Sequence, residues 1–133
     1  MRALAMALLC GCSAVRVHAP GLESGVDAAI NVGMQVRHGD EDALLRVSER
    51  PGLKFGGHAY DTLGCARRAY AAPTASPAVV AHEIGHMLGL QHVDDTRSVM
   101  HKSAPADHDG LTSEQRRTTR REAAILSACE VIQ

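Results

Sequence analysis

Aromatic residues are almost absent from this sequence: its 133 residues include no tryptophan, one phenylalanine and two tyrosines. A core must therefore be filled by alanine, valine, leucine, isoleucine and methionine, and the length suffices for one domain rather than two. Neither sign of charge prevails, because 14 lysines and arginines face 15 aspartates and glutamates. Without a basic excess, the composition gives no reason to expect a nucleic-acid partner.

The sequence also lacks an apolar run long enough to cross a bilayer as a helix. It does begin with a positive charge and a short apolar stretch, which is the layout of a secretory signal. The segment Leu9–Cys12 resembles a bacterial lipobox, in which Cys12 would carry the lipid. We therefore expect a lipoprotein-type signal over 1–11 and one domain over 12–133, exported and lipid-anchored in the bacterial cell envelope. Periplasmic or secreted protein without a lipid, and a cytosolic chain, are the alternatives.

What is present is a stretch of histidines and glycines, HEIGHMLGLQH, at residues 82–92. His82 and His86 are four residues apart, so a helix over 78–88 places them on one face, where both can reach one metal ion. Gly89 can adopt the left-handed conformation that ends a helix, and the turn that follows can bring His92 to the same ion. Three protein ligands leave a position open for water, as in catalytic zinc sites.

Glu83 stands beside the first of these histidines and points next to the metal position. Its carboxylate is placed to take a proton from an activated water and poorly placed to bind the ion itself. The alternative is a core helix that carries histidines by accident, and the number of matching positions argues against it.

The pattern HExxHxxGxxH followed by a methionine is similar to the signature of the metzincin metallopeptidases. Met100 stands eight residues after His92, where a metzincin has its Met-turn, and this distance resembles the matrixin branch. The resemblance implies a zinc-dependent endopeptidase with one catalytic Zn2+ on His82, His86 and His92 and with Glu83 as general base for a zinc-activated water. Val93 replaces the usual serine, and the Pro-x-Tyr of the specificity pocket is missing, so substrate preference does not carry over.

The resemblance also implies an α+β fold: a small metzincin-like domain with a twisted mixed sheet, a zinc-binding active-site helix, a Met-turn and a C-terminal helix. A strand near 65–70 would then form the sheet edge that pairs with a peptide or protein substrate in extended conformation. In the residues themselves, Ser24 is a candidate helix cap, and Thr112 with Gln115 has the pattern of a capping box. Periodicity predicts strands over 14–18, 43–47, 55–60 and 65–70, and helices over 24–39, 78–88 and from Thr112 to about Cys129.

Further metal sites and a disulfide are open questions at this point. Cys65 and Cys129 could pair in an oxidising compartment, or they could be two unrelated buried thiols. A second zinc on the triplet His38-Gly39-Asp40 with His58 lacks a fourth ligand. The aspartates of residues 94–109 lack the spacing of an EF-hand, so calcium is not supported either.

Two other functions are compatible with these residues. The chain could be a surface lipoprotein that binds zinc or a partner and catalyses little, although zinc storage alone does not require Glu83. It could also hydrolyse an amide that is not part of a protein, because the same activated water would serve.

Overall fold

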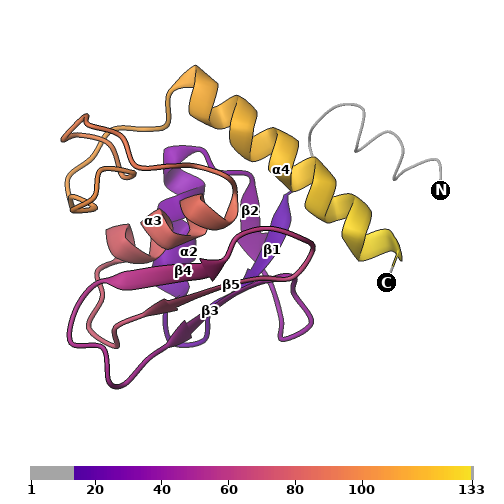
Figure 1. The fold of residues 1–133 in the computed structure, drawn as a ribbon, viewed down its shortest axis with the longest axis horizontal. Coiled ribbons are helices and arrows are strands. Elements are labelled where there is room, and N and C mark those ends of the chain that lie inside the picture. The colour runs from indigo at the N-terminus through magenta and orange to yellow at the C-terminus, as the bar shows by residue number, and fades with distance from the viewer. Residues whose placement is uncertain (1–13, 133) are drawn as a thin grey trace.

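The computed structural model describes residues 14–132, so the expected signal and Cys12 lie outside the described residues. Five strands form one sheet, and helices α2 and α3 pack together against one of its faces (Figure 1). This architecture confirms the α+β prediction. In chain order the elements are β1 Val15–His18, α2 Glu23–Val32, β2 Val36–His38, β3 Leu45–Glu49, β4 Gly57–Asp61, β5 Arg67–Ala71, α3 Pro77–Met87 and α4 Ser113–Ile132.

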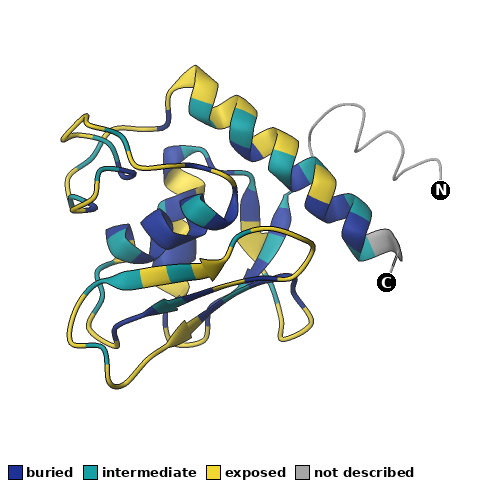
Figure 2. Cartoon of the chain, viewed as in Figure 1, coloured by how far each residue is buried: buried dark blue, intermediate teal, exposed yellow. Residues whose placement is uncertain are grey.

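The strand order is β2-β1-β3-β5-β4, and all neighbours are parallel except the antiparallel pair β4 and β5. Buried residues alternate with more exposed ones along β1, β5 and residues 45–48 of β3, as strand geometry requires (Figure 2). Apart from Arg67, the buried residues on the face toward the helices are apolar, namely Val15, Val17, Leu45, Val47, Ala69 and Ala71. The opposite face carries polar and charged side chains, namely Arg16, His18, Arg46, Ser48, Arg68 and Tyr70.

The edge of the sheet is not where the sequence predicted it. The strand near 65–70 is β5, which lies between β3 and β4, and the antiparallel outer strand is β4. A short connection over 62–66 joins the two strands, so they must be neighbours, but the residue pattern alone did not show which of them lies outside. The exposure of β4, with no fully buried residue along it, agrees with an edge position (Figure 2).

The first helix also differs from the prediction, because α2 ends at Val32 and not near Gly39. Gly33 has a φ of 103° and donates its N–H to Ile30, which is a left-handed helix end. The apolar spacing continued past this point because Met34 is buried after the helix has ended. Ser24 does not cap the helix, which starts one residue earlier after Leu22 and has no side-chain cap.

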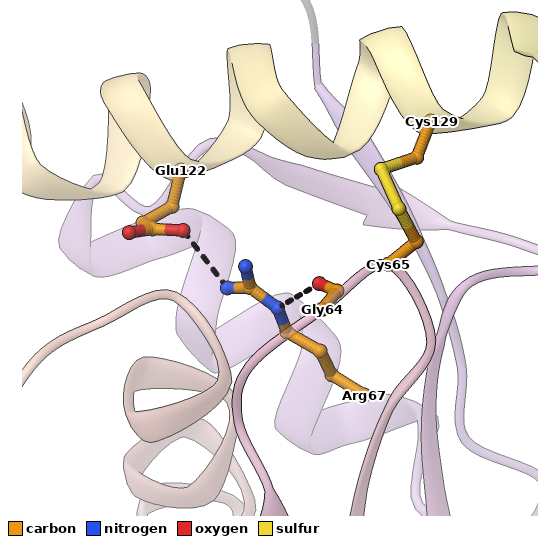
Figure 3. The surroundings of a disulfide bond; sticks show 5 residues. All are labelled: Gly64, Cys65, Arg67, Glu122 and Cys129. Carbon is orange, nitrogen blue, oxygen red and sulfur yellow. Dashed lines mark hydrogen bonds and ion pairs between the residues drawn. A yellow bond between two sulfur atoms is a disulfide. The ribbon is translucent and has the colours of Figure 1, made fainter.

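Helix α4 is attached to the rest of the molecule at several points. Its capping box is confirmed: the Thr112 N–H donates to Gln115 Oε1 at 2.9 Å, and the Gln115 N–H donates to Thr112 Oγ1 at 3.1 Å. A disulfide joins Cys129 to Cys65 in the connection between β4 and β5, with 5.8 Å between the Cα atoms (Figure 3). None of the helices within residues 14–132 combines the length and apolar character needed to cross a membrane.

A buried arginine that sequence reasoning missed links three elements near this bridge. The Arg67 guanidinium, at the start of β5, donates to Glu122 of α4 at 2.9 Å (Figure 3). It also donates to the Met87 carbonyl at the end of α3 at 2.7 Å. It is only 4% exposed. A buried charge with such partners orients the elements that supply them, so Arg67 holds the end of α3 against α4.

Candidate active site

Helix α3 begins with two local signals. Ser76 is its N-cap and accepts a hydrogen bond from the Val79 N–H at 3.3 Å, and Pro77 occupies the first turn, where it needs no N–H partner. The helix packs closely on α2, because a Cβ added to Gly25 would lie 2.2 Å from Val80 Cγ1. This close packing fixes the position of α3, and with it the position of the helix face that carries His82 and His86.

The chain reverses directly after α3, at the glycine for which the motif predicts a turn. Gly89 has a φ of 84°, and the Leu90 N–H donates back to the Gly85 carbonyl at 2.9 Å. This hydrogen bond closes the helix end in the left-handed manner that favours glycine. The reversed segment brings His92 against the histidine face of α3.

The three imidazoles meet at their Nε2 atoms. His82 Nε2 lies 3.1 Å from His86 Nε2 and 3.1 Å from His92 Nε2. Within residues 14–132, these histidines form the one group of three or more potential ligands whose ligand atoms all lie within 4.8 Å of one another. The structure therefore brings together the three residues that were predicted as metal ligands from their spacing in the sequence.

Two of the histidines are held by their second nitrogen. His82 Nδ1 lies 2.7 Å from the Val99 carbonyl, and His86 Nδ1 lies 2.8 Å from the Leu90 carbonyl. A carbonyl only accepts, so each Nδ1 carries the proton and each Nε2 keeps its lone pair for a metal. Burial lowers the pKa of His82 to about 4 and also lowers the pKa of His86, which keeps both rings neutral at pH 7, as metal binding requires.

Glu83 lies in the same pocket and is only 5% exposed. Its Oε1 is 4.0 Å from His82 Nε2, and its Oε2 is buried without a hydrogen-bond partner among the described residues. Burial raises the pKa of this carboxyl to about 7, and a hydrogen bond from the Ala59 backbone opposes the shift. A buried carboxyl oxygen without a partner is rare in folded proteins, so the site has room for a polar group that is not part of the chain.

Gly57, which the sequence reasoning did not select, gives this carboxylate its space. A Cβ at Gly57 would lie 2.8 Å from Glu83 Cγ and 2.9 Å from the Tyr70 carbonyl oxygen. Strand β4 can therefore approach the Glu83 side chain only because residue 57 has no side chain. A glycine inside the strand predicted over 55–60 is the signal that could have indicated such a close approach.

Met100 follows Val99, whose carbonyl lies against His82 Nδ1, and is completely buried. Its sulfur packs so closely on α3 that a Cβ at Gly85 would lie 2.4 Å from it. The Met100 carbonyl accepts a hydrogen bond from the Val93 N–H at 3.2 Å. Met100 thus connects α3 to the segment that carries His92.

The other candidate metal residues do not join this group. His38 pairs with Asp27 at 2.7 Å, and Arg97 pairs with Asp107 and Asp109 at 3.1 and 3.0 Å. His58 is exposed on β4 and lines the same cleft as the three histidines.

A cleft of about 940 Å3 opens above the three imidazoles. Residues 57–59 of β4 form one wall, and Ser103 and Ala104 contribute to the lining. Two of its apolar lining side chains are mostly in solvent: Phe55 is 83% exposed and Leu63 is 80% exposed. The outer strand β4 and the three histidines thus line the same cleft.

Comparison with known families adds one finding. The family model described as Matrixin matches residues 32–117, more than half of the chain. The match spans β2 to the first turn of α4 and includes all three histidines. No curated protein matches this chain.

Proposed function

The chain belongs to the matrixin family of metallopeptidases, and on that premise we propose that it is a zinc-dependent endopeptidase with Glu83 as its general base. One observation carries the proposal. Three Nε2 atoms converge in a cleft directly beside a buried carboxylate oxygen that has no partner among the described residues. This combination of a nitrogen ligand set and an adjacent base is what hydrolysis by an activated water requires.

The residues present fit zinc. Imidazole nitrogens suit this ion, and three protein ligands are the number that catalytic zinc sites use. His82 and His86 present their Nε2 lone pairs in fixed directions because carbonyl groups hold their Nδ1 atoms. When bound, zinc would supply a Lewis acid that polarises the scissile carbonyl and acidifies a water.

Glu83 performs the proton transfers in this proposal. Its carboxylate accepts a proton as the oxygen of water attacks the carbonyl carbon, and it delivers that proton to the amine as the C–N bond breaks. The side chain is only 5% exposed and lines the cleft, so it has little contact with bulk water. Gly57 keeps the strand wall close to it without displacing it.

Strand β4 supports binding of an extended peptide. It is the outer strand of the sheet, and its residues 57–59 line the cleft. The main-chain groups of an edge strand can pair with a peptide whatever the side chains of that peptide are. The scissile bond would then pass over the histidines.

The test compares wild type with Glu83→Gln, which keeps the shape of the side chain. We expect both proteins to hold one zinc by mass spectrometry, and we expect the variant to cleave a mixed peptide library about 100-fold more slowly or worse, as for a lost general base. Glu114→Gln, an exposed change on α4, is the matched control. Equal cleavage by Glu83→Gln and wild type would overturn the mechanism.

If both proteins hold zinc and neither cleaves any peptide, the endopeptidase proposal is wrong. A zinc-binding or partner-binding surface lipoprotein, or a hydrolase of another amide, would then explain the site better. Assaying the same pair of proteins on amide-linked cell-wall fragments separates these two alternatives, since only the hydrolase depends on Glu83.

We also propose that the protein is exported through residues 1–11 and anchored by a lipid on Cys12. The disulfide between Cys65 and Cys129 supports export, because such bonds persist in oxidising compartments. Cys12→Ser should move the protein from the detergent phase to the aqueous phase of a bacterial lysate. An unchanged distribution would remove Cys12 as the anchor.

A further inference from the structure

The polar face of the sheet holds a second hollow, on the side away from α2 and α3. It has a volume of about 280 Å3, and six of its lining residues define what we call the cationic hollow: His18, Arg46, Ser48, Tyr60, Arg68 and Tyr70. None of these residues takes part in the histidine site. Parts of the hollow are open to solvent, since Arg68 and Tyr60 are exposed.

The hollow places like charges side by side. Arg46 of β3 is the register partner of His18 on one side and of Arg68 on the other. Arg46 and Arg68 are both permanently charged, and like charges directly opposite each other on one face of a sheet repel and destabilise it. The arrangement therefore has a cost in folding that an anion in the hollow would remove.

Within residues 14–130, no carboxylate oxygen lies within 4.0 Å of the guanidinium nitrogens of these two arginines. Arg46 and Arg68 form no ion pair there, and Asp61, across from Arg68 in register, does not come within 4.0 Å. Other arginines of the chain do have such partners: Arg16 pairs with Asp42 at 2.8 Å. The positive charge of the cationic hollow is thus available to a ligand.

The aromatic residues favour a carboxylate ligand over a nucleobase. Tyr60 and Tyr70 stack with their ring centres 4.8 Å apart, and the Arg50 guanidinium lies 4.7 Å from the centre of the Tyr70 ring. Proteins that bind single-stranded nucleic acid rely on open aromatic rings. The Tyr70 ring already has two stacking partners, whereas arginine side chains bind carboxylates directly.

The cationic hollow lies close enough to β4 for a peptide bound along this strand to reach it. A peptide paired with the outer edge of β4 would direct every second side chain to the polar face of the sheet, beside Tyr60. Neighbouring strands are about 4.8 Å apart, so Arg68 would be about 10 Å from that peptide, within the combined reach of two long side chains. Arg46 adds positive charge behind Arg68.

We infer that the cationic hollow recognises acidic side chains at alternate positions of the peptide substrate. This inference rests on the proposed function, because it takes the peptide in the cleft as the source of the carboxylates. The sequence lacks the Pro-x-Tyr pattern of the specificity pocket and so does not indicate a substrate preference. The inference assigns this preference to acidic peptides.

Binding without turnover tests the inference. Two fluorescein-labelled peptides, one with glutamate and one with glutamine at alternate positions, are titrated by anisotropy against the full chain carrying Glu83→Gln. We expect the glutamate peptide to bind about fivefold more tightly, as two exposed ion pairs allow, and 0.5 M salt to remove the difference. Adding Arg46→Gln and Arg68→Gln should abolish the preference.

The matched control adds Arg120→Gln and Arg121→Gln, which remove two exposed charges from α4 and should keep the preference. Equal affinity for both peptides, or the same loss in the control, would overturn the inference. Stronger competition by a single-stranded oligonucleotide than by an acidic peptide of equal charge would overturn it in favour of nucleic acid.

Cleavage by wild type separates this inference from the proposed function. If wild type cleaves both peptides with equal kcat/KM and binding shows no preference, the peptidase proposal stands and the hollow has no role in recognition. If binding shows the preference and neither peptide is cleaved, the peptidase proposal is wrong and the hollow remains a site for acidic peptides.

Discussion

Strand β4 and its neighbour β5 separate two surfaces that are built in opposite ways. On the helix side, His82 and Glu83 are each 5% exposed and the histidine is fixed by a hydrogen bond from its Nδ1. On the other side, the half-buried Arg46 lies beside the exposed Arg68, and neither has an ion-pair partner within residues 14–130. The groups on the helix side are held in place by burial and hydrogen bonds, whereas the other surface is characterised by its positive charge.

This difference indicates how each surface responds to mutation. A buried group that must meet a metal or a water within a fraction of an ångström loses its effect when it moves slightly. An exposed arginine on a long flexible stem acts over several ångströms and is screened by salt, so its loss has a small and salt-dependent effect. Changes in the cleft should therefore have large effects, and changes in the cationic hollow should have small ones.

The largest effect on the cleft side should come from His86→Ala. The variant loses one of three nitrogen ligands. Removing a residue that only hydrogen-bonds to a ligand typically lowers metal affinity roughly 10- to 100-fold, and we expect the zinc affinity of this variant to fall by more than that. Competition with a chelator measures the affinity. His108→Ala is the control, because this half-buried histidine bonds only to the Pro105 carbonyl in its own segment. Unchanged zinc affinity in His86→Ala would remove this residue as a ligand.

The histidine site could be predicted from the sequence because it is local. Three ligands and the base lie within eleven consecutive residues, and helix periodicity with one left-handed glycine places them together. The disulfide and the strand order depend on pairing between distant segments. Cys65 and Cys129 are 64 residues apart, and nothing in their surroundings indicates that they meet.

The sheet edge and the cationic hollow show the same limit. Alternation predicts which residues of a strand share a face, so Arg46 and Arg68 could be assigned to polar faces of their own strands. Their position side by side follows from the parallel register of β3 and β5, which no residue pattern specifies. The end of α2 was missed for a different reason, because Met34 continues the helical spacing of apolar residues after Gly33 has ended the helix.

Gly57→Ala tests the contact between the strand and the base. The added methyl group would lie 2.8 Å from Glu83 Cγ and 2.9 Å from a backbone oxygen, so the carboxylate or the strand must shift. We expect kcat/KM to fall about 10- to 100-fold, as displacement of a reacting group by a fraction of an ångström allows, while zinc content stays the same.

Gly52→Ala is the control for this change, since a Cβ there meets no atom within 4 Å. Full activity in Gly57→Ala would show that β4 tolerates a side chain at this position. Catalysis in the cleft would then not depend on the close contact between β4 and Glu83. Equal loss in both variants would point to a general effect of losing glycine rather than to the Glu83 contact.

The smallest effect should come from Arg46→Gln. Unlike the two changes in the cleft, which cause losses, this change should raise the stability of the protein. This change removes a charge that lies directly beside Arg68 in register, so it relieves repulsion worth about 0.5 kcal/mol across the sheet. Thermal unfolding at low salt should show Tm about 2 °C above wild type, and added salt should shrink the difference because it screens the repulsion in wild type. Arg50→Gln, which removes a guanidinium stacked on Tyr70, should not raise Tm. A lower Tm for Arg46→Gln would mean that the arginine stem stabilises the sheet by packing, and the repulsion that distinguishes this surface from the cleft would be absent.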